Sequence, residues 1–209
     1  MEYECWDVCG KTLEFIEDEH LYIYDGVVVD YSITEMLKYR FGNKYAGIAP
    51  EILKRAADKG TAVHEAIENW CKTGEESELP EVRNFKFLKN MYNFEVIKNE
   101  VPVVLHDKDG ELLAAGRLDL VLVMDGKVGG ADIKRTATLD KEYLAYQLNL
   151  YRIAYRQCYG VEWEFLRGVH LRDNVRKFVE IPIREDQIWG FIDEWKRNHK
   201  YFEGENGKD

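Results

Sequence analysis

The sequence predicts an α/β protein built on a central mixed β-sheet with helices on either side. Three consecutive β-prone runs between residues 101 and 133, separated by turn sequences, predict an antiparallel meander within that sheet. Long stretches with helical periodicity precede and follow these runs, at about residues 50–70 and 139–159, and they provide the covering layers. With 209 residues, 45% of them hydrophobic, residues 1–209 are expected to form a single domain around one core.

The first predicted element is a β-hairpin over about residues 12–30. Two β-prone runs between Leu21 and Val29 surround Asp25-Gly26, a pair typical of a tight hairpin turn. Ser32 or Thr34 is then placed to cap a short helix through residues 35–39.

Two helices are expected next. Pro50 suits a first helical turn, and helix-forming residues continue to about Trp70, with one interruption at Gly60. Apolar residues at helical spacing give this segment a face for the core: Val63, Ile67, Trp70 and Cys71. A second helix is predicted from Pro80 to about Phe94.

The remaining elements alternate between strands and helices. Strands are predicted over residues 101–105, 112–123 and 128–133, and we interpret Gly129-Gly130 as a bend where the third strand begins. A helix over 139–159 closes at Gly160 and is followed by strands over 161–171 and 177–183. A last amphipathic helix around residues 188–195 precedes a polar tail over 204–209.

Charge and targeting signals narrow the possible functions. The net charge of −10 argues against a protein that coats nucleic acid by bulk electrostatics. Residues 131–177 nevertheless carry nine Lys or Arg against six Asp or Glu, which leaves open a local phosphate-binding face or a solvated mixed surface. An acidic beginning and the lack of a long apolar run give no signal peptide or membrane span, so we expect a cytoplasmic protein, in a bacterium or a phage-infected host.

Two acids and a lysine on neighbouring strands suggest chemistry. Asp119 lies in the middle strand of the meander and Asp132 lies near the end of the next, so an antiparallel pairing can set them side by side. Adjacent carboxylates repel one another unless a cation lies between them, and hard oxygen ligands suit Mg²⁺ or Mn²⁺. Lys134 shares a strand face with Asp132 and could orient an attacking water or stabilise charge on a reacting phosphate.

The succession Gly116-Arg-Leu-Asp119, Asp132-Ile-Lys134 and Gln147-Leu-Asn-Leu-Tyr151 resembles RecB-type nucleases of the PD-(D/E)XK superfamily. Gly60-Thr-Ala-Val-His64 is similar to the histidine motif of that branch, and Tyr31 to Leu37 is similar to the opening of small phage and prophage proteins assigned as exonucleases. The resemblance covers about residues 21–155. It implies a restriction-endonuclease-like core and a metal-dependent deoxyribonuclease, most simply an exonuclease of phage or mobile-element origin.

The resemblance also implies roles for individual residues. The catalytic residues would be Asp119, Asp132 and Lys134. The metal ligands would be His64, Asp119, Asp132, the main-chain carbonyl of Ile133 and, by a looser match, Glu100. Gln147 and Tyr151 would face the site, either positioning DNA or holding the catalytic strand. Arg117 and Arg135, which flank the aspartates, are candidate DNA contacts.

The sequence and the resemblance together indicate which cofactors and partners to expect. No cysteine follows Cys158, and the four cysteines form no C-x-x-C pair, so neither an iron–sulfur cluster nor a disulfide framework is expected. No phosphate-binding loop sequence is present, so no nucleotide cofactor is expected. DNA is the expected partner, a recombination protein or further copies of the chain are candidate additional partners, and no membrane is expected.

Other interpretations of these residues are open at this point. Arg117 and Arg135 could neutralise the aspartates as structural ion pairs, and His64 beside Glu65 could be a surface residue. A DNA endonuclease of the same fold, or a nucleic-acid-binding module that kept the fold without the chemistry, are the alternative functions.

Overall fold

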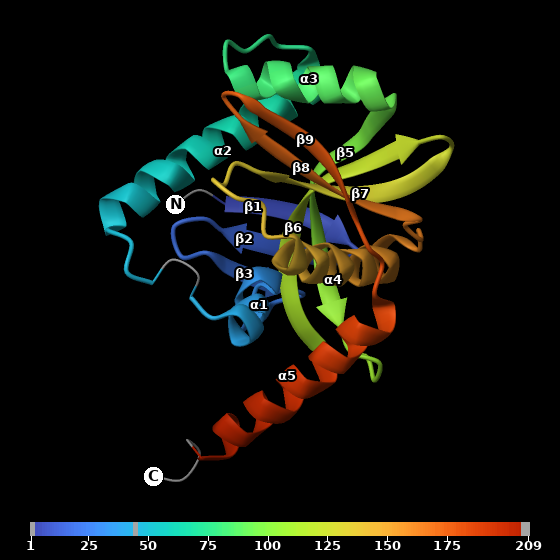
Figure 1. Ribbon diagram of the computed structural model, residues 1–209. Helices are drawn as coiled ribbons and strands as arrows, with labels where there is room; N and C mark the ends of the chain where they lie inside the picture. The colour runs from blue at the N-terminus through green and yellow to red at the C-terminus, as the bar shows by residue number, and fades with distance from the viewer. Residues whose placement is uncertain (1–2, 44–45, 206–209) are drawn as a thin grey trace.

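The computed structural model describes residues 3–43 and 46–205, with side chains described up to residue 199. It contains a five-stranded central sheet, a smaller four-stranded sheet near the N-terminus, and five helices within these ranges. Figure 1 shows the central sheet between the helices, with the small sheet beside it. The predicted α/β class is confirmed.

The central sheet runs in the order β5-β6-β7-β8-β9, with β5 at Phe94–His106, β6 at Leu112–Met124, β7 at Lys127–Lys134, β8 at Phe165–Arg172 and β9 at Val175–Ile181. The first three strands form the predicted antiparallel meander, which is confirmed. β7 and β8 pair in parallel, because α4 at Lys141–Tyr159 carries the chain back across the sheet between them. The sheet is therefore mixed, as predicted.

Helices cover both faces of the central sheet. α1 (Ile33–Phe41), α4 and α5 (Glu185–Glu205) share one hydrophobic core with residues of β5, β6 and β8. α2 (Pro50–Thr73) and α3 (Pro80–Tyr92) form a second core on the other face, and Figure 1 shows these two helices together, away from α4 and α5. No helix within the described ranges is both long and apolar enough to cross a bilayer.

The N-terminal sheet is larger than predicted. The hairpin of β3 (Leu21–Tyr24) and β4 (Val27–Val29) is confirmed, with Asp25 and Gly26 at φ of 54° and 79°. A second hairpin, β1 (Tyr3–Val8) and β2 (Lys11–Ile16), pairs with it to make the order β1-β2-β3-β4. Its buried residues pack against Val104 of β5 and Ala115 of β6, so this sheet rests on the part of the meander that leads to Asp119.

Most of the predicted helix boundaries depend on neighbouring residues, and most of them agree with the structure. Ser32 caps α1, accepting from the Glu35 amide while the Glu35 carboxylate accepts from the Ser32 amide. Gly60, expected to interrupt α2, lies inside an unbroken helix. The polar tail predicted over 204–209 falls partly in α5, which continues to Glu205, and residues 206–209 lie outside the described residues.

Gly129 and Gly130 correct another expectation. They lie within β7 and not at a bend where the strand begins. A Cβ added at Gly130 would lie 1.9 Å from the Trp163 ring, and one at Gly129 would lie 2.5 Å from Phe165. The glycines therefore allow two aromatic residues to pack directly on the backbone of the strand that carries Asp132.

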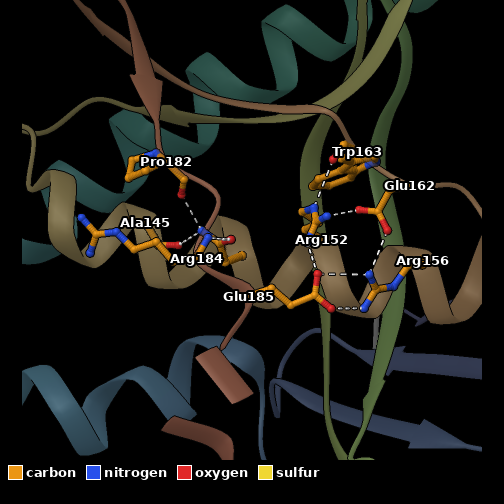
Figure 2. Close-up of polar contacts among 9 residues, drawn as sticks. Ala145, Arg152, Arg156, Glu162, Trp163, Pro182, Arg184 and Glu185 are labelled. Carbon is orange, nitrogen blue, oxygen red and sulfur yellow. Dashed lines mark hydrogen bonds and ion pairs between the residues drawn. The ribbon is translucent and has the colours of Figure 1, made fainter. Parts of the chain in front are cut away.

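The α4–α5 junction is fixed by a cluster of ion pairs, drawn in Figure 2. Glu185, in the first turn of α5, accepts from Arg152 Nη1 at 2.7 Å and from Arg156 Nη2 at 2.6 Å. Both arginines also pair with Glu162 in the loop before β8. Two arginines of the basic stretch 131–177 therefore serve this junction.

Candidate metal centre

The candidate site lies where β6 and β7 separate. Their paired residues end at Leu120 and Ala131, and beyond this point the Asp119 side chain takes the place of a backbone acceptor. The Ile133 amide donates to Asp119 Oδ2 at 2.6 Å. This bond fixes the first predicted carboxylate against the strand that carries the second.

His64 approaches the same place from α2. Its Nδ1 lies 3.6 Å from Glu100 Oε1 and 3.7 Å from Asp119 Oδ2. Its Nε2 lies 3.2 Å from the carbonyl oxygen of Ile133. An imidazole whose second nitrogen is held by a backbone carbonyl is the usual arrangement of a histidine ligand, and here it directs Nδ1 toward the carboxylates.

His64, Glu100 and Asp119 form the candidate metal triplet, since each offers a ligand atom and all three atoms lie within 4.8 Å of one another. One nitrogen and two carboxylate oxygens suit Mn²⁺ and are compatible with Mg²⁺. Glu100 has φ of +46°, a left-handed conformation that costs a residue with a side chain about 1–2 kcal/mol. The backbone of β5 is thus strained at the residue that brings its carboxylate to His64.

Asp132 and Lys134 lie beside the triplet as a buried ion pair. Lys134 Nζ is 2.7 Å from Asp132 Oδ2, and Asp132 is only 2% exposed. The two residues share one face of β7, as predicted. The structure therefore joins Asp132 directly to Lys134, while His64, Glu100 and Asp119 are the three that converge on one point.

Burial and neighbouring charges together set the pKa values of these groups. Burial acts to lower the pKa of His64, but Asp119 and Glu100 outweigh it and raise that pKa to about 9. Burial raises the pKa of Asp132 to about 6, with Asp119 adding to the shift and Lys134 opposing it. Burial likewise raises the pKa of Asp119. Lys134 is partly buried, which alone would lower its pKa, yet the two aspartates raise it.

The two flanking arginines do not neutralise the aspartates. Arg117 Nε lies 2.9 Å from Glu100 Oε2, and its Nη1 donates to both oxygens of Glu4 at 2.9 Å. Arg117 therefore holds Glu100 in place, and we interpret it as a positioning residue of the site.

Arg135 points away from the aspartates, which corrects its interpretation as their counter-charge, and its two ion pairs favour a structural role over the predicted DNA contact. It pairs with Glu81 of α3 at 2.6 Å and with Asp173 at 3.2 Å, and it is largely buried. Glu81 itself is only 2% exposed. Arg135 thus ties β7 to α3, and the structural role explains its charge.

Gln147 and Tyr151 are buried, at 5% and 4% exposure, so the interpretation as strand supports holds better than that as direct DNA contacts. A Cβ added at Gly116 would lie 3.1 Å from the Tyr151 ring, so this glycine gives Tyr151 its place under β6. Burial first, then Tyr22, and then the charges of Asp119 and Asp132 raise the pKa of Tyr151 well above its usual range. The Gln147 Oε1 atom is buried without a hydrogen-bond partner among the described residues.

One contributor, Glu4, was missed from the sequence. It belongs to β1, and it reaches the site only because β1 is part of the N-terminal sheet. The signal that could have found it is the alternation of residues 3–8 and 11–16 around Cys9-Gly10.

Comparison with known proteins adds little to this geometry. No family model matches the chain, and no curated protein matches it. The crystal structure of SSO0001 aligns with 79% of this chain and 74% of that chain, at 17% sequence identity and a TM-score of 0.45. At this TM-score the likeness assigns neither fold nor function, and the candidate site stands on its own residues.

Proposed function

We propose that the chain is a metal-dependent deoxyribonuclease with a restriction-endonuclease-like core, and specifically an exonuclease of RecB type. The observation that carries the proposal is the convergence of His64, Glu100 and Asp119 beside the buried pair of Asp132 and Lys134. These residues come from α2, β5, β6 and β7, so the fold brings together groups spread over 70 residues of sequence. The carboxylates of Glu100, Asp119 and Asp132 all act on the one imidazole of His64, and a divalent cation would replace its proton as their counter-charge.

The donor set fits Mg²⁺ or Mn²⁺. His64 Nδ1, Glu100 and Asp119 would hold the ion, and Asp132 would add negative charge beside them. The Ile133 carbonyl, predicted as a ligand, supports the site by orienting the His64 ring. Such a cation, when bound, offsets charge on the scissile phosphate and acidifies the attacking water.

Lys134 supplies the protein's own positive charge. Its raised pKa keeps the ammonium protonated, and its contact with Asp132 fixes the side chain on the site face of β7. The ammonium can therefore stabilise negative charge that develops on the phosphate oxygens as the bond breaks. Asp132 holds this ammonium in position.

Two alternatives share the fold. An endonuclease would use the same residues on an internal phosphodiester bond. A binding module that kept the fold without catalysis would have no use for the Asp132–Lys134 pair, which costs desolvation energy to bury. DNA is the proposed substrate in each case, and a recombination protein or a second copy of the chain are proposed as further partners.

The test is digestion of end-labelled linear DNA and closed circular DNA with Mn²⁺, with Mg²⁺ or with EDTA. We expect cleavage only with metal, and a loss of roughly 10²- to 10³-fold in rate for Lys134→Ala, the usual cost of removing one group that stabilises transition-state charge. Loss of linear molecules with survival of circles identifies an exonuclease. Equal loss of both identifies an endonuclease and rejects the exonuclease assignment.

Lys127→Ala is the matched control, because Lys127 lies on the same strand, at its far end, and pairs with a glutamate. Its rate should equal that of the wild type. Cleavage that persists in EDTA, or a Lys134→Ala variant as active as the control, would refute the mechanism.

A further inference from the structure

Lys134 lies between two cavities whose lining residues differ in charge. One, which we name the lysine pocket, has a volume of about 520 Å³ and is lined by residues of α1, the loop after β7 and the start of α4, among them Thr34, Lys38, Lys134, Leu139, Asp140 and Tyr143. The other, which we name the acidic pocket, has a volume of about 600 Å³ and includes His64 and Glu100. Lys134 contacts Asp132, the charge of Asp119 acts on Asp132, and Asp119 lies 3.7 Å from His64, so these charged residues connect the two cavities.

The negative charge of the acidic pocket repels a nucleic acid strand. Its lining includes the carboxylates of Glu4, Glu17, Glu65, Glu68 and Glu100. The one arginine among its lining residues, Arg117, is already paired with Glu4 and Glu100. Phosphates carried into this cavity would meet like charges within a few ångströms, so this side favours cations and excludes polyanions.

The lysine pocket has the complementary charge. Lys38 is 69% exposed, with Glu35 at the limit of ion-pair distance, 3.9 Å from its ammonium, and Lys134 lines the same pocket from β7. Asp140, the one acid among the described residues that line it, is engaged as the N-cap of α4, where it accepts from the Tyr143 amide at 2.9 Å. The N-terminus of α4 adds further positive potential at the same wall.

The walls of the lysine pocket are held in place. His170 of β8 lies 2.7 Å, by its Nε2, from the carbonyl of Thr136, and the Thr136 hydroxyl donates to the carbonyl of Thr138. His170 is itself buried, at 3% exposure. The loop between β7 and α4 is therefore fixed to the sheet, so the cavity does not need to form when a ligand arrives.

We propose that the lysine pocket takes one nucleotide of a single DNA strand, beside the phosphate that lies at Lys134, and that the strand does not continue into the acidic pocket. A volume of about 520 Å³ falls in the range of roughly 300–1,000 Å³ that small ligands occupy, which suits one nucleotide and not a duplex. The Tyr143 ring and Leu139 offer apolar surface for a base or sugar. This inference rests on the proposed function, and it assigns the substrate as a single-stranded end that arrives from the α1–α4 side.

The first arm of the test measures binding of a fluorescent single-stranded oligonucleotide by anisotropy in EDTA, at several salt concentrations. We expect Lys38→Gln to weaken binding several-fold and to reduce the slope of log affinity against log salt by about 0.7, the contribution of one phosphate contact on a single strand. Lys127→Gln changes a lysine of similar exposure, 60%, at the far end of β7, and this variant should match the wild type. Equal behaviour of the two variants, or no salt-dependent binding by the wild type, overturns the inference.

The second arm compares linear and circular single-stranded DNA as substrates with Mn²⁺. Loss of the linear strand with survival of the circle supports a path that stops at the acidic pocket. Equal loss of the circle overturns this path while leaving the nuclease intact. If neither is cleaved, the proposed function fails, and the binding arm, which needs no cleavage, still decides whether the lysine pocket holds a strand.

Discussion

At the scale of single residues, the site depends on close approaches that only certain residues permit. Gly130 leaves room for Trp163, and Gly116 leaves room for Tyr151, on the two strands that carry the aspartates. Neither glycine needs a positive φ, so its value lies in the missing side chain and not in the backbone. The sequence pattern G-x-x-D therefore has a packing cause at this position.

Gly130→Ala should destabilise the protein strongly. The new Cβ would overlap the Trp163 ring, three of whose atoms lie within 2.5 Å of it, and overpacking of this kind costs about 3 kcal/mol. Urea unfolding followed by fluorescence measures the change. Gly60→Ala is the control: it lies in α2 with open space around its Cβ, so it should raise stability by about 0.5–1 kcal/mol. Equal effects of the two would contradict this account.

Lys134→Met should lower stability, because Asp132 would remain buried without its cation. Loss of one partner of a buried pair costs about 3–5 kcal/mol, and the 25% exposure of Lys134 reduces this to about 2 kcal/mol. Adding Asp132→Asn removes the unpaired charge, so the double variant should recover most of the loss. A double variant less stable than Lys134→Met would show that the pair is not the source of the effect.

At the scale of elements, α5 is attached to the core through its first turn. Hydrogen bonds from Arg156, and then from Arg152, lower the pKa of Glu185 to about 2, although partial burial opposes the shift. Asn149 reinforces the junction, because its side-chain oxygen accepts from the Arg184 amide and its nitrogen donates to the carbonyls of Ala145 and Pro182. These three partner residues are labelled in Figure 2. The helix is thus positioned by charge and by backbone capping together.

Glu185→Gln should therefore destabilise the protein at neutral pH, and the difference from the wild type should disappear in acid. A carboxylate with a lowered folded pKa stabilises the fold above its unfolded pKa, near 4.3, and loses that contribution as pH falls toward about 2. Thermal unfolding between pH 7 and pH 2.5 measures this. Glu180→Gln, an exposed residue with a long contact to Arg167, should show little difference at any pH. A constant gap between Glu185→Gln and wild type across this range would contradict the assignment.

The sequence predicts elements well where their causes are local and poorly where they are not. The Ser32 cap and the Asp25-Gly26 turn each depend on neighbouring residues, and both appear as expected. Arg135 was misread because its partners, Glu81 and Asp173, are 54 and 38 residues away. Gly130 was misread for the same reason, since Trp163 reaches it only through the β7–β8 pairing.

In the candidate site too, residues placed by local geometry could be predicted and residues placed by long-range contacts could not. Asp132 and Lys134 could be placed on one face because strand geometry alone puts them there. Glu100 could not be placed from spacing, because its carboxylate reaches His64 through a positive φ that no local sequence pattern predicts. The opposing charges of the lysine and acidic pockets depend on residues from α1, α2, α4 and the N-terminal sheet, so they emerge only in the folded chain.

At the scale of the whole molecule, the proposed metal links distant parts of the chain. His64 comes from the helical layer on one face, and Asp119 and Glu100 come from the sheet, so an ion at the triplet would tie α2 to the meander. A ligand that binds only the folded chain stabilises it by mass action.

Mn²⁺ should therefore raise the melting temperature. At about 100 times its dissociation constant it would add about 2.7 kcal/mol, or roughly 5–10 °C for a chain of this size. Asp119→Asn should abolish the shift, and Asp125→Asn, in the turn at the far end of β6, should retain it. Calorimetry with and without EDTA measures both. An undiminished shift in Asp119→Asn would place the ion elsewhere.

The hydrogen bond from the Ile133 amide to Asp119 Oδ2 makes the backbone a reporter of the carboxylate. An amide proton that donates to a carboxylate resonates according to the charge on that oxygen, so the ¹H–¹⁵N signal of Ile133 should move when a proton or a cation changes Asp119. In a nuclear magnetic resonance titration with diamagnetic Mg²⁺, this single peak would follow occupancy of the centre directly, without DNA and without turnover.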